Sequence, residues 1–288
     1  MNNKMAVRQQ PKFSVAIQTD GYKNLINNTL QDPKRAGRFI AAISSAVAVN
    51  PTLQECEAGS ILSSALLGES LNLSPSPQLG QYYLVPFDVK TGIKDAEGKD
   101  IKVKKAQFQL GYKGYIQLAI RSGQYKKLNV LAVKEGELIR FDPLLEEIEI
   151  NLIEDDIKRE TAETIGYYAM FEYSNGFRKA MYWSKAKMES HALRYSKGYA
   201  AKKGYTFWEK DFDSMAFKTM LRQLISKWGV MSIEMQQAFD GDMGVINQDG
   251  TVEYVDNEVV EQPVTVVENA EKPVEQGQQT LSMDDLEG

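Results

Sequence analysis

One glycine, Gly111, marks the point that most constrains the fold, because the hydrophobic period changes there from two residues to a helical repeat. Before it, apolar and polar side chains alternate over residues 105–110, which predicts a strand with one buried face. The apolar positions nearest the glycine are Ala106, Phe108 and Leu110. A glycine allows the chain to leave such a strand sharply.

Residues 112–122 follow with the period of a helix that has one apolar face. The opposite face has three polar residues four positions apart, which are Lys113, Gln117 and Arg121. Gly114 lies near this polar stripe and removes a side chain from it. Gly123 comes where a left-handed helix cap is expected, and Lys126 and Lys127 follow. The pattern predicts a rigid helix with a basic face, which suits a phosphate backbone.

The rest of the chain mixes helical and strand periods, which indicates an α+β class. Residues 52–55 have the form of a capping box and are expected to open the second helix. Asn175-Gly176 lies between two alternating apolar runs and predicts a hairpin. Residues 88–100 are expected to form a polar loop. The predicted helices cover residues 34–49, 52–71, 185–195, 213–228 and 232–239, and the predicted strands cover residues 81–87, 102–110, 128–141, 146–153, 165–173 and 177–183.

Charge divides the chain into a basic and an acidic part. Residues 241–288 contain twelve Asp and Glu and one base, Lys272, for a net charge of -11. Residues 1–240 contain 33 bases and 27 acids, for a net charge of +6. A basic folded part with an acidic appendage is typical of nucleic-acid binders. We expect residues 1–20 to form a mobile arm, residues 21–240 one domain, and residues 241–288 a disordered tail.

Several kinds of chemistry lack support in the sequence. There is no GxxxxGK[ST] motif for an ATP-driven motor, and the single Cys56 and single His191 cannot build the usual zinc site, so no cofactor or metal is expected. Seven carboxylates would suit a metal-dependent nuclease only if they converged, and a solvated strand face is the favoured interpretation. They are Asp142, Glu146, Glu147, Glu149, Glu154, Asp155 and Asp156.

The sequence also bears on the compartment. The first residues contain no apolar run long enough for a signal peptide or a membrane span. One cysteine excludes an internal disulfide and fits a reducing compartment. We therefore expect a cytoplasmic protein with no membrane contact.

Basic residues interleaved with aromatic residues are the main functional signal. Cations neutralise phosphates, and aromatic faces stack on unpaired bases at about 1–3 kcal/mol per base. The candidate DNA-binding residues are Lys105, Lys113, Gln117, Arg121, Lys126, Lys127, Lys185, Lys187, Arg194, Lys197, Lys202, Lys203, Lys218 and Arg222. The candidate base-stacking residues are Tyr112, Tyr115, Tyr125, Tyr195, Tyr199 and Trp208. For Tyr112 and Tyr115, which lie on an apolar helix face, packing is the favoured role.

Two further segments carry a family resemblance: GQYYLVPF at residues 80–87 and FWEKDFDSMAFKTMLRQLISKWG at residues 207–229. With residues 108–127 they resemble the RecT family of phage single-strand annealing proteins, over about residues 32–239. The resemblance implies a small bent antiparallel sheet packed on a long helix, with extra helices. It also implies a binding protein, not an enzyme, that pairs complementary strands without ATP. The alternatives are a passive protein that protects single strands and, in another class, the nuclease.

The resemblance also implies partners: single-stranded DNA, the annealed duplex, and further copies of the chain in a ring or helical filament. Small residues in the first two predicted helices fit either a subunit contact or an ordinary helical hairpin. The acidic tail could occupy the basic groove, aid solubility, or present residues 281–286 to a host single-strand-binding protein or a partner exonuclease. A chain that stops after Gly241 is expected to fold and to bind DNA.

Overall fold

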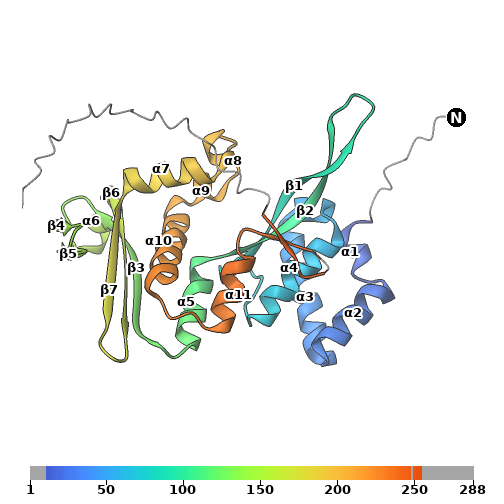
Figure 1. Cartoon of the computed structure of the whole chain (residues 1–288), viewed down its shortest axis with the longest axis horizontal. Coiled ribbons are helices and arrows are strands. Elements are labelled where there is room, and N and C mark those ends of the chain that lie inside the picture. Colours follow the sequence, from blue (N-terminus) through green and yellow to red (C-terminus); the bar gives the residue numbers. More distant parts are fainter. Residues whose placement is uncertain (1–10, 248, 255–288) are drawn as a thin grey trace, which may run out of the picture.

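The structure is a computed structural model that describes residues 11–247 and 249–254. It combines helices with small antiparallel sheets, which confirms the α+β class (Figure 1). Among the helices of these residues, none is long and apolar enough to cross a membrane.

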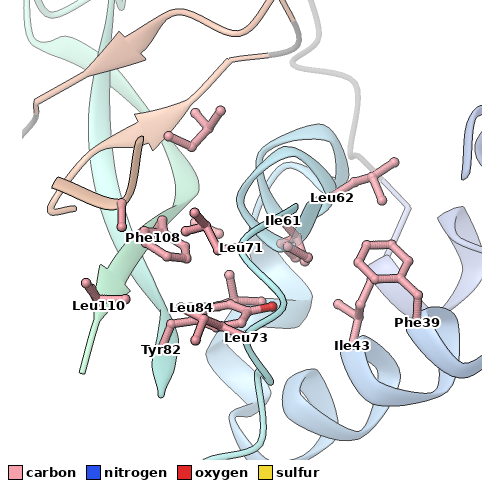
Figure 2. Close-up of a cluster of buried hydrophobic side chains, with 14 of the residues drawn as sticks. Phe39, Ile43, Ile61, Leu62, Leu71, Leu73, Tyr82, Leu84, Phe108 and Leu110 are labelled. Atoms are coloured by element: carbon pink, nitrogen blue, oxygen red, sulfur yellow. The ribbon is translucent and has the colours of Figure 1, made fainter. Parts of the chain in front are cut away.

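Helices and one long hairpin form the N-terminal part of the molecule. Helix α4 lies between α3 and the hairpin, so Phe39 and Ile43 approach it from one side and Tyr82 and Phe108 from the other (Figure 2). The elements are α1 (Phe13–Ala16), α2 (Asp20–Leu30), α3 (Pro33–Val49), the 3-10 helix η1 (Pro51–Glu55), α4 (Ala58–Ser70), β1 (Tyr82–Lys94) and β2 (Asp100–Leu110).

A three-stranded antiparallel sheet with strand order β3-β6-β7 forms the C-terminal part. Alternate residues of β6, among them Tyr167 and Phe171, are buried against Met220 and Leu224 of α10. This is the small sheet on a long helix that the family resemblance predicted, and the hairpin at Gly176 is confirmed as well. The elements are β3 (Tyr125–Lys134), β6 (Thr164–Tyr173), β7 (Arg178–Ser184), α7 (Lys185–Tyr195), α8 (Lys197–Ala200), α9 (Phe207–Lys210) and α10 (Phe212–Trp228).

Two shorter helices join the two parts. Helices α5 (Tyr112–Arg121) and α11 (Ile233–Gly241) lie with α10 in the middle of the molecule (Figure 1). The ring of Tyr115 packs edge-on against Phe239 of α11, with ring centroids 5.2 Å apart. Helix α5 therefore has one face in the core, as its period predicted.

Residues 135–163 form an insert between β3 and β6, made of β4 (Leu138–Asp142), β5 (Glu147–Ile150) and α6 (Asp156–Thr161). It packs on the sheet face opposite α10. Glu137 is fully buried there and accepts hydrogen bonds from the Arg159 guanidinium at 2.7 Å and from the Lys134 amide at 2.7 Å. Charged and backbone donors offset the cost of burying a carboxylate. Because Lys134 belongs to β3, the bond from its amide to Glu137 fixes the insert to the sheet. Helix α6 was not predicted.

Two predictions for the N-terminal part are wrong. Phe13 and Ile17 are buried in the core, so residues 11–20 are packed and do not form an arm, while residues 1–10 lie outside the described residues. The predicted capping box at residues 52–55 is instead a 3-10 helix, and α4 begins at Ala58 after Glu57, without a side-chain cap.

The predicted polar loop at residues 88–100 is mostly strand. Strands β1 and β2 continue their pairing through Val89 and Val103 to Lys94 and Asp100. The hairpin therefore projects well beyond the body of the molecule (Figure 1). The side chains of residues 90–99 are all exposed, so no burial pattern marked them as strands.

The predicted start of the acidic tail is also wrong. Val245 and Ile246 are buried, and β8 (Val245–Ile246) pairs with β9 (Val252–Glu253). The Phe108 amide donates to the Gly244 carbonyl at 2.9 Å, which attaches this segment to β2. Residues 242–247 and 249–254 thus belong to the fold, and the remainder of the predicted disordered tail, residues 255–288, lies outside the described residues.

Candidate nucleic-acid interface

Helix α5 is held in place by two glycines in its first turn. A Cβ on Gly111 would collide with the carbonyl oxygen of Gly80, and a Cβ on Gly114 would collide with that of Gln81. Gly114 is therefore buried by close packing, and the prediction that it keeps the polar stripe uncluttered is wrong. Because this packing fixes the rotation of α5, Lys113 and Gln117 face solvent as predicted.

Arg121 is exposed on the same stripe, but its guanidinium already has protein partners. Its Nη2 donates to the Leu71 carbonyl at 2.8 Å, and its Nη1 lies 3.5 Å from the Asn72 carbonyl. These carbonyls follow the last turn of α4, where backbone acceptors lack helical donors. Arg121 therefore ties α5 to the end of α4 in addition to presenting a positive charge.

An aromatic cleft of about 190 Å³ opens beside the N-terminus of α5. Its walls include the rings of Tyr83 and Phe207, whose centroids are 5.2 Å apart, and the ring of Tyr112. Lys210 at the end of α9 is exposed on the rim, and Asp211 beside it is engaged in capping α10 through the Ser214 amide at 3.0 Å. This aromatic cleft combines stacking surfaces with a nearby cation.

The lining residues of the aromatic cleft that were missing from the predicted site include Tyr83, Phe207 and Lys210. A signal for them existed, because residues 80–87 and 207–229 were the segments that carried the family resemblance. Those segments are distant in sequence and meet at this cleft. Burial, together with Asp211 and Tyr112, raises the pKa of the Tyr83 hydroxyl, so this side chain remains neutral and able to stack at ordinary pH.

The structure turns two of the candidate DNA-binding residues, Lys218 and Arg222, toward a protein carboxylate. Lys218 is 6% exposed at the floor of the aromatic cleft, and its ammonium is 2.8 Å from Oδ1 of Asp242. Arg222 Nη1 is 2.8 Å from Oδ2 of the same carboxylate, which also accepts the Tyr115 hydroxyl at 2.9 Å and the Leu110 amide at 2.9 Å. Asp242 therefore joins α5, α10 and β2 through four donors.

Burial governs the charges in this Asp242 cluster. It lowers the pKa of the Lys218 ammonium, while Asp242 opposes that shift. It raises the pKa of the Tyr115 hydroxyl well above its usual value. The two α10 cations neutralise a protein carboxylate in this arrangement, so the sequence pattern that suggested phosphate contacts here has a structural explanation.

The other predicted cations are spread over several elements. Lys126 and Lys127 are exposed, and both pair with Glu172, at 2.8 and 3.4 Å. Lys105 lies 3.6 Å from Glu253, and Lys185 lies 3.3 Å from Glu163. The remaining ones are Lys187 over the Trp183 ring, Arg194 over the Tyr195 ring, half-buried Lys197 on α8, and the exposed Lys202 and Lys203 that lead into α9.

The predicted stacking residues differ in their exposure. Tyr115 and Trp208 are buried, so neither ring face is open to a base. Tyr125 is half-buried against Phe171 and donates its hydroxyl hydrogen to the Val230 carbonyl at 3.2 Å, and Tyr199 packs on Trp208 and Phe212. Tyr112 lines the aromatic cleft, and Tyr195 is 44% exposed on α7.

The carboxylates of the nuclease alternative do not gather around one point. Asp142 accepts the Leu144 and Leu145 amides, Asp155 caps α6, and Glu146 pairs with Lys179 and Lys227. Within residues 11–247 and 249–254, no group of three potential ligands could hold a metal ion. His191, between Trp183 and Tyr195, is half-buried, and burial followed by Arg194 lowers its pKa to about 4.

Comparison with known proteins adds a family and two relatives. The model of the RecT family matches residues 37–275, which continues past residue 239, where the sequence resemblance was expected to end. An uncharacterized Bacillus subtilis protein, YqaK, is 41% identical over 247 residues, which cover 83% of this chain and 76% of that protein. Protein RecT of Escherichia coli is 30% identical over 237 residues, which cover 82% of this chain and 81% of that protein.

Proposed function

The chain belongs to the RecT family, and we propose that it binds single-stranded DNA and anneals complementary strands without ATP. Family membership supports a protein of DNA recombination and strand annealing. The proposal goes further in three respects: the protein binds single strands, it needs no ATP, and it acts by binding and not by catalysis. The site described above supports these three claims.

The aromatic cleft is the observation that carries this proposal. Tyr83, Tyr112 and Phe207 offer ring surfaces that an unpaired base can contact but a stacked, paired base cannot. Lys113 and Lys210 are exposed close to it and would neutralise phosphates of the same strand. A site of this composition favours single strands over duplex, with little preference for sequence.

Annealing follows from the same features. Two phosphate backbones repel each other, and the basic surface lowers that repulsion while the bases remain free to pair. Base pairing itself supplies the sequence specificity. The proposed activity therefore requires no chemical step and no nucleotide triphosphate.

Two assays test the proposal. Pairing of complementary, protein-free oligonucleotides should be accelerated without any nucleotide. Fluorescence anisotropy should show affinity for a single strand that falls with salt, with a slope of about -0.7 per neutralised phosphate. Lys210→Glu should weaken binding, whereas Lys158→Glu should not, because both lysines are exposed in the last turn of a short helix but Lys158 lies in the insert.

The outcomes separate the alternatives. Binding without accelerated pairing would favour the passive protective protein. Equal effects of Lys210→Glu and Lys158→Glu would remove the aromatic cleft from the proposal. Cleavage of a labelled strand with Mg²⁺ would favour the nuclease.

A further inference from the structure

The insert at residues 135–163 differs in charge from everything around it. It contains eleven Asp and Glu against three Lys and Arg. The rest of the described chain contains 28 Lys and Arg against 19 Asp and Glu. A segment with a net charge of -8 repels DNA phosphates, so the insert requires an explanation other than DNA binding.

The insert also presents the most exposed aliphatic side chains of the described residues. Leu144 and Leu145, side by side in the turn between β4 and β5, are 88% and 62% exposed. Ile139, Leu152 and Ile157 of the same insert are exposed as well. Exposed aliphatic groups on this scale, bordered by charges, are typical of protein–protein contacts.

The turn that carries the two leucines is held in one conformation. Glu146 ends it with φ +55°, a conformation that residues other than glycine adopt infrequently. Its carboxylate pairs with Lys179 of β7 and with Lys227 of α10, the latter at 3.7 Å. The body of the protein therefore fixes the leucine pair in position before any partner arrives.

A complementary surface lies in the N-terminal part of the molecule, on the outer face of α3. Its exposed residues recur every three or four positions and are basic at one end and small along the rest. They are Lys34, Gly37, Arg38, Ala41, Ser45 and Ala48, and Pro33 and Val49 at the two ends of the helix are exposed as well. Small side chains let a bulky leucine pair approach the helix closely, and Lys34 and Arg38 match the acidic border of the insert.

The insert lies at one end of the longest axis of the molecule, and α3 lies in the N-terminal part, toward the other end (Figure 1). One chain cannot bring its own two surfaces together. We propose that the Leu144–Leu145 turn of one copy docks on the outer face of α3 of a second copy. Such a contact joins unlike surfaces, so it repeats head to tail and builds a ring or a filament. The proposal does not depend on DNA binding.

Two variants, each with one surface disabled, test this contact in the full-length protein without DNA. Leu144→Ser/Leu145→Ser removes the apolar pair, and Ala41→Glu/Ser45→Glu places bulk and negative charge on α3. All four positions are exposed, so both variants should melt as the wild type does. Sedimentation velocity should show that each variant raises the self-association dissociation constant at least about tenfold.

The decisive step is to mix the two variants. The α3 of the leucine variant is intact, and so is the turn of the α3 variant, so an equimolar mixture should form 1:1 pairs that grow no further. Matched controls are Leu193→Ser, and Ala186→Glu/Ser190→Glu, which has the same spacing on exposed positions of α7. These controls should self-associate as the wild type does.

Several results would overturn the proposal. The proposal fails if the wild-type protein stays monomeric at all concentrations without DNA. It also fails if the two variants self-associate as strongly as the wild type. Mixed variants that remain monomers would show that the turn of one copy does not bind α3 of another. A change in single-strand affinity with normal self-association would instead concern the proposed function.

Discussion

Helices α5 and α10 look alike in the sequence and differ in the structure. Each has an apolar face and, opposite it, polar or basic residues four positions apart. On α5, Lys113 and Gln117 face solvent beside the aromatic cleft. On α10, Lys218 and Arg222 turn inward to the carboxylate of Asp242.

The difference comes from a third segment. Residues 242–246, which follow α11, pair with β2 at Phe108 and bring a buried carboxylate to α10, whereas nothing in the described chain covers the outer face of α5. Amphipathic spacing shows which residues share a face, but it does not show what covers that face. A basic stripe is therefore compatible both with a DNA-binding surface and with an internal ion cluster.

Truncation of the chain near residue 242 should have the largest effect. A chain that stops after Gly241 loses Asp242 and β8, so it should be insoluble or lack a cooperative melt, contrary to the expectation from sequence. A chain that stops after Tyr254 should melt as the full-length protein does and still anneal bare oligonucleotides. Circular dichroism melts show whether each chain unfolds cooperatively. A normal melt of the shorter chain would mean that the fold does not require residues 242–254.

Removal of the shared carboxylate alone should have the next largest effect. Asp242→Ala leaves Lys218 and Arg222 without their counter-charge in a buried site, which should lower the free energy of unfolding by about 3–5 kcal/mol. Asp240→Ala, two residues earlier and exposed, should change it by less than about 0.5 kcal/mol. Urea denaturation of both variants gives the comparison. Equal stabilities would mean that the Asp242 cluster contributes nothing.

Arg222→Ala should have an intermediate effect, because its guanidinium is partly exposed and Lys218 still pairs with Asp242. We expect a loss of about 1–3 kcal/mol in the free energy of unfolding, from the bonds to Asp242 and to the Tyr115 hydroxyl. Affinity for single strands, measured where the variant is fully folded, should change little. A stable variant with weak DNA binding would restore the sequence-based assignment of Arg222.

The sequence predicted those features that depend on local patterns. The strand-to-helix change at Gly111, the Asn-Gly hairpin and the extents of α7 and α10 are all confirmed. Tyr112, one of the candidate stacking residues, lines the aromatic cleft. These features depend on spacing within about ten residues, which a sequence displays directly.

The features that the sequence missed depend on contacts between distant segments. Residues 242–254 lack apolar periodicity, so the sequence predicts a tail there, whereas in the structure Asp242 contacts Lys218, Arg222 and Tyr115. The aromatic cleft needs Tyr83 beside Phe207, which are more than a hundred residues apart. Gly114 was assigned to a solvent face because its close neighbour, Gln81, belongs to another segment.

The smallest expected effects distinguish the roles of two cations of α5, Lys113 and Arg121. Within the described part of the chain, the Lys113 ammonium makes no hydrogen bond or ion pair, whereas the Arg121 guanidinium donates to the Leu71 carbonyl. Lys113→Ala should leave the free energy of unfolding within about 0.5 kcal/mol. It should also make the salt slope of single-strand binding less steep by about 0.7, because one phosphate contact is lost.

Arg121→Ala should instead lower the free energy of unfolding by about 0.5–1.5 kcal/mol, since the carbonyl at the end of α4 loses its donor. Arg121→Lys keeps the charge but loses the bidentate reach, so it should restore the salt slope and only part of the stability. Salt titrations by anisotropy and urea denaturation of the three variants give both quantities. The contrary outcome would have two parts: Lys113→Ala would leave the salt slope unchanged, and Arg121→Ala and Arg121→Lys would alter that slope equally, although only the first removes the charge. The exposed face of α5 would then be a solvated surface that does not contact DNA, and its resemblance to α10 would carry no information about DNA binding.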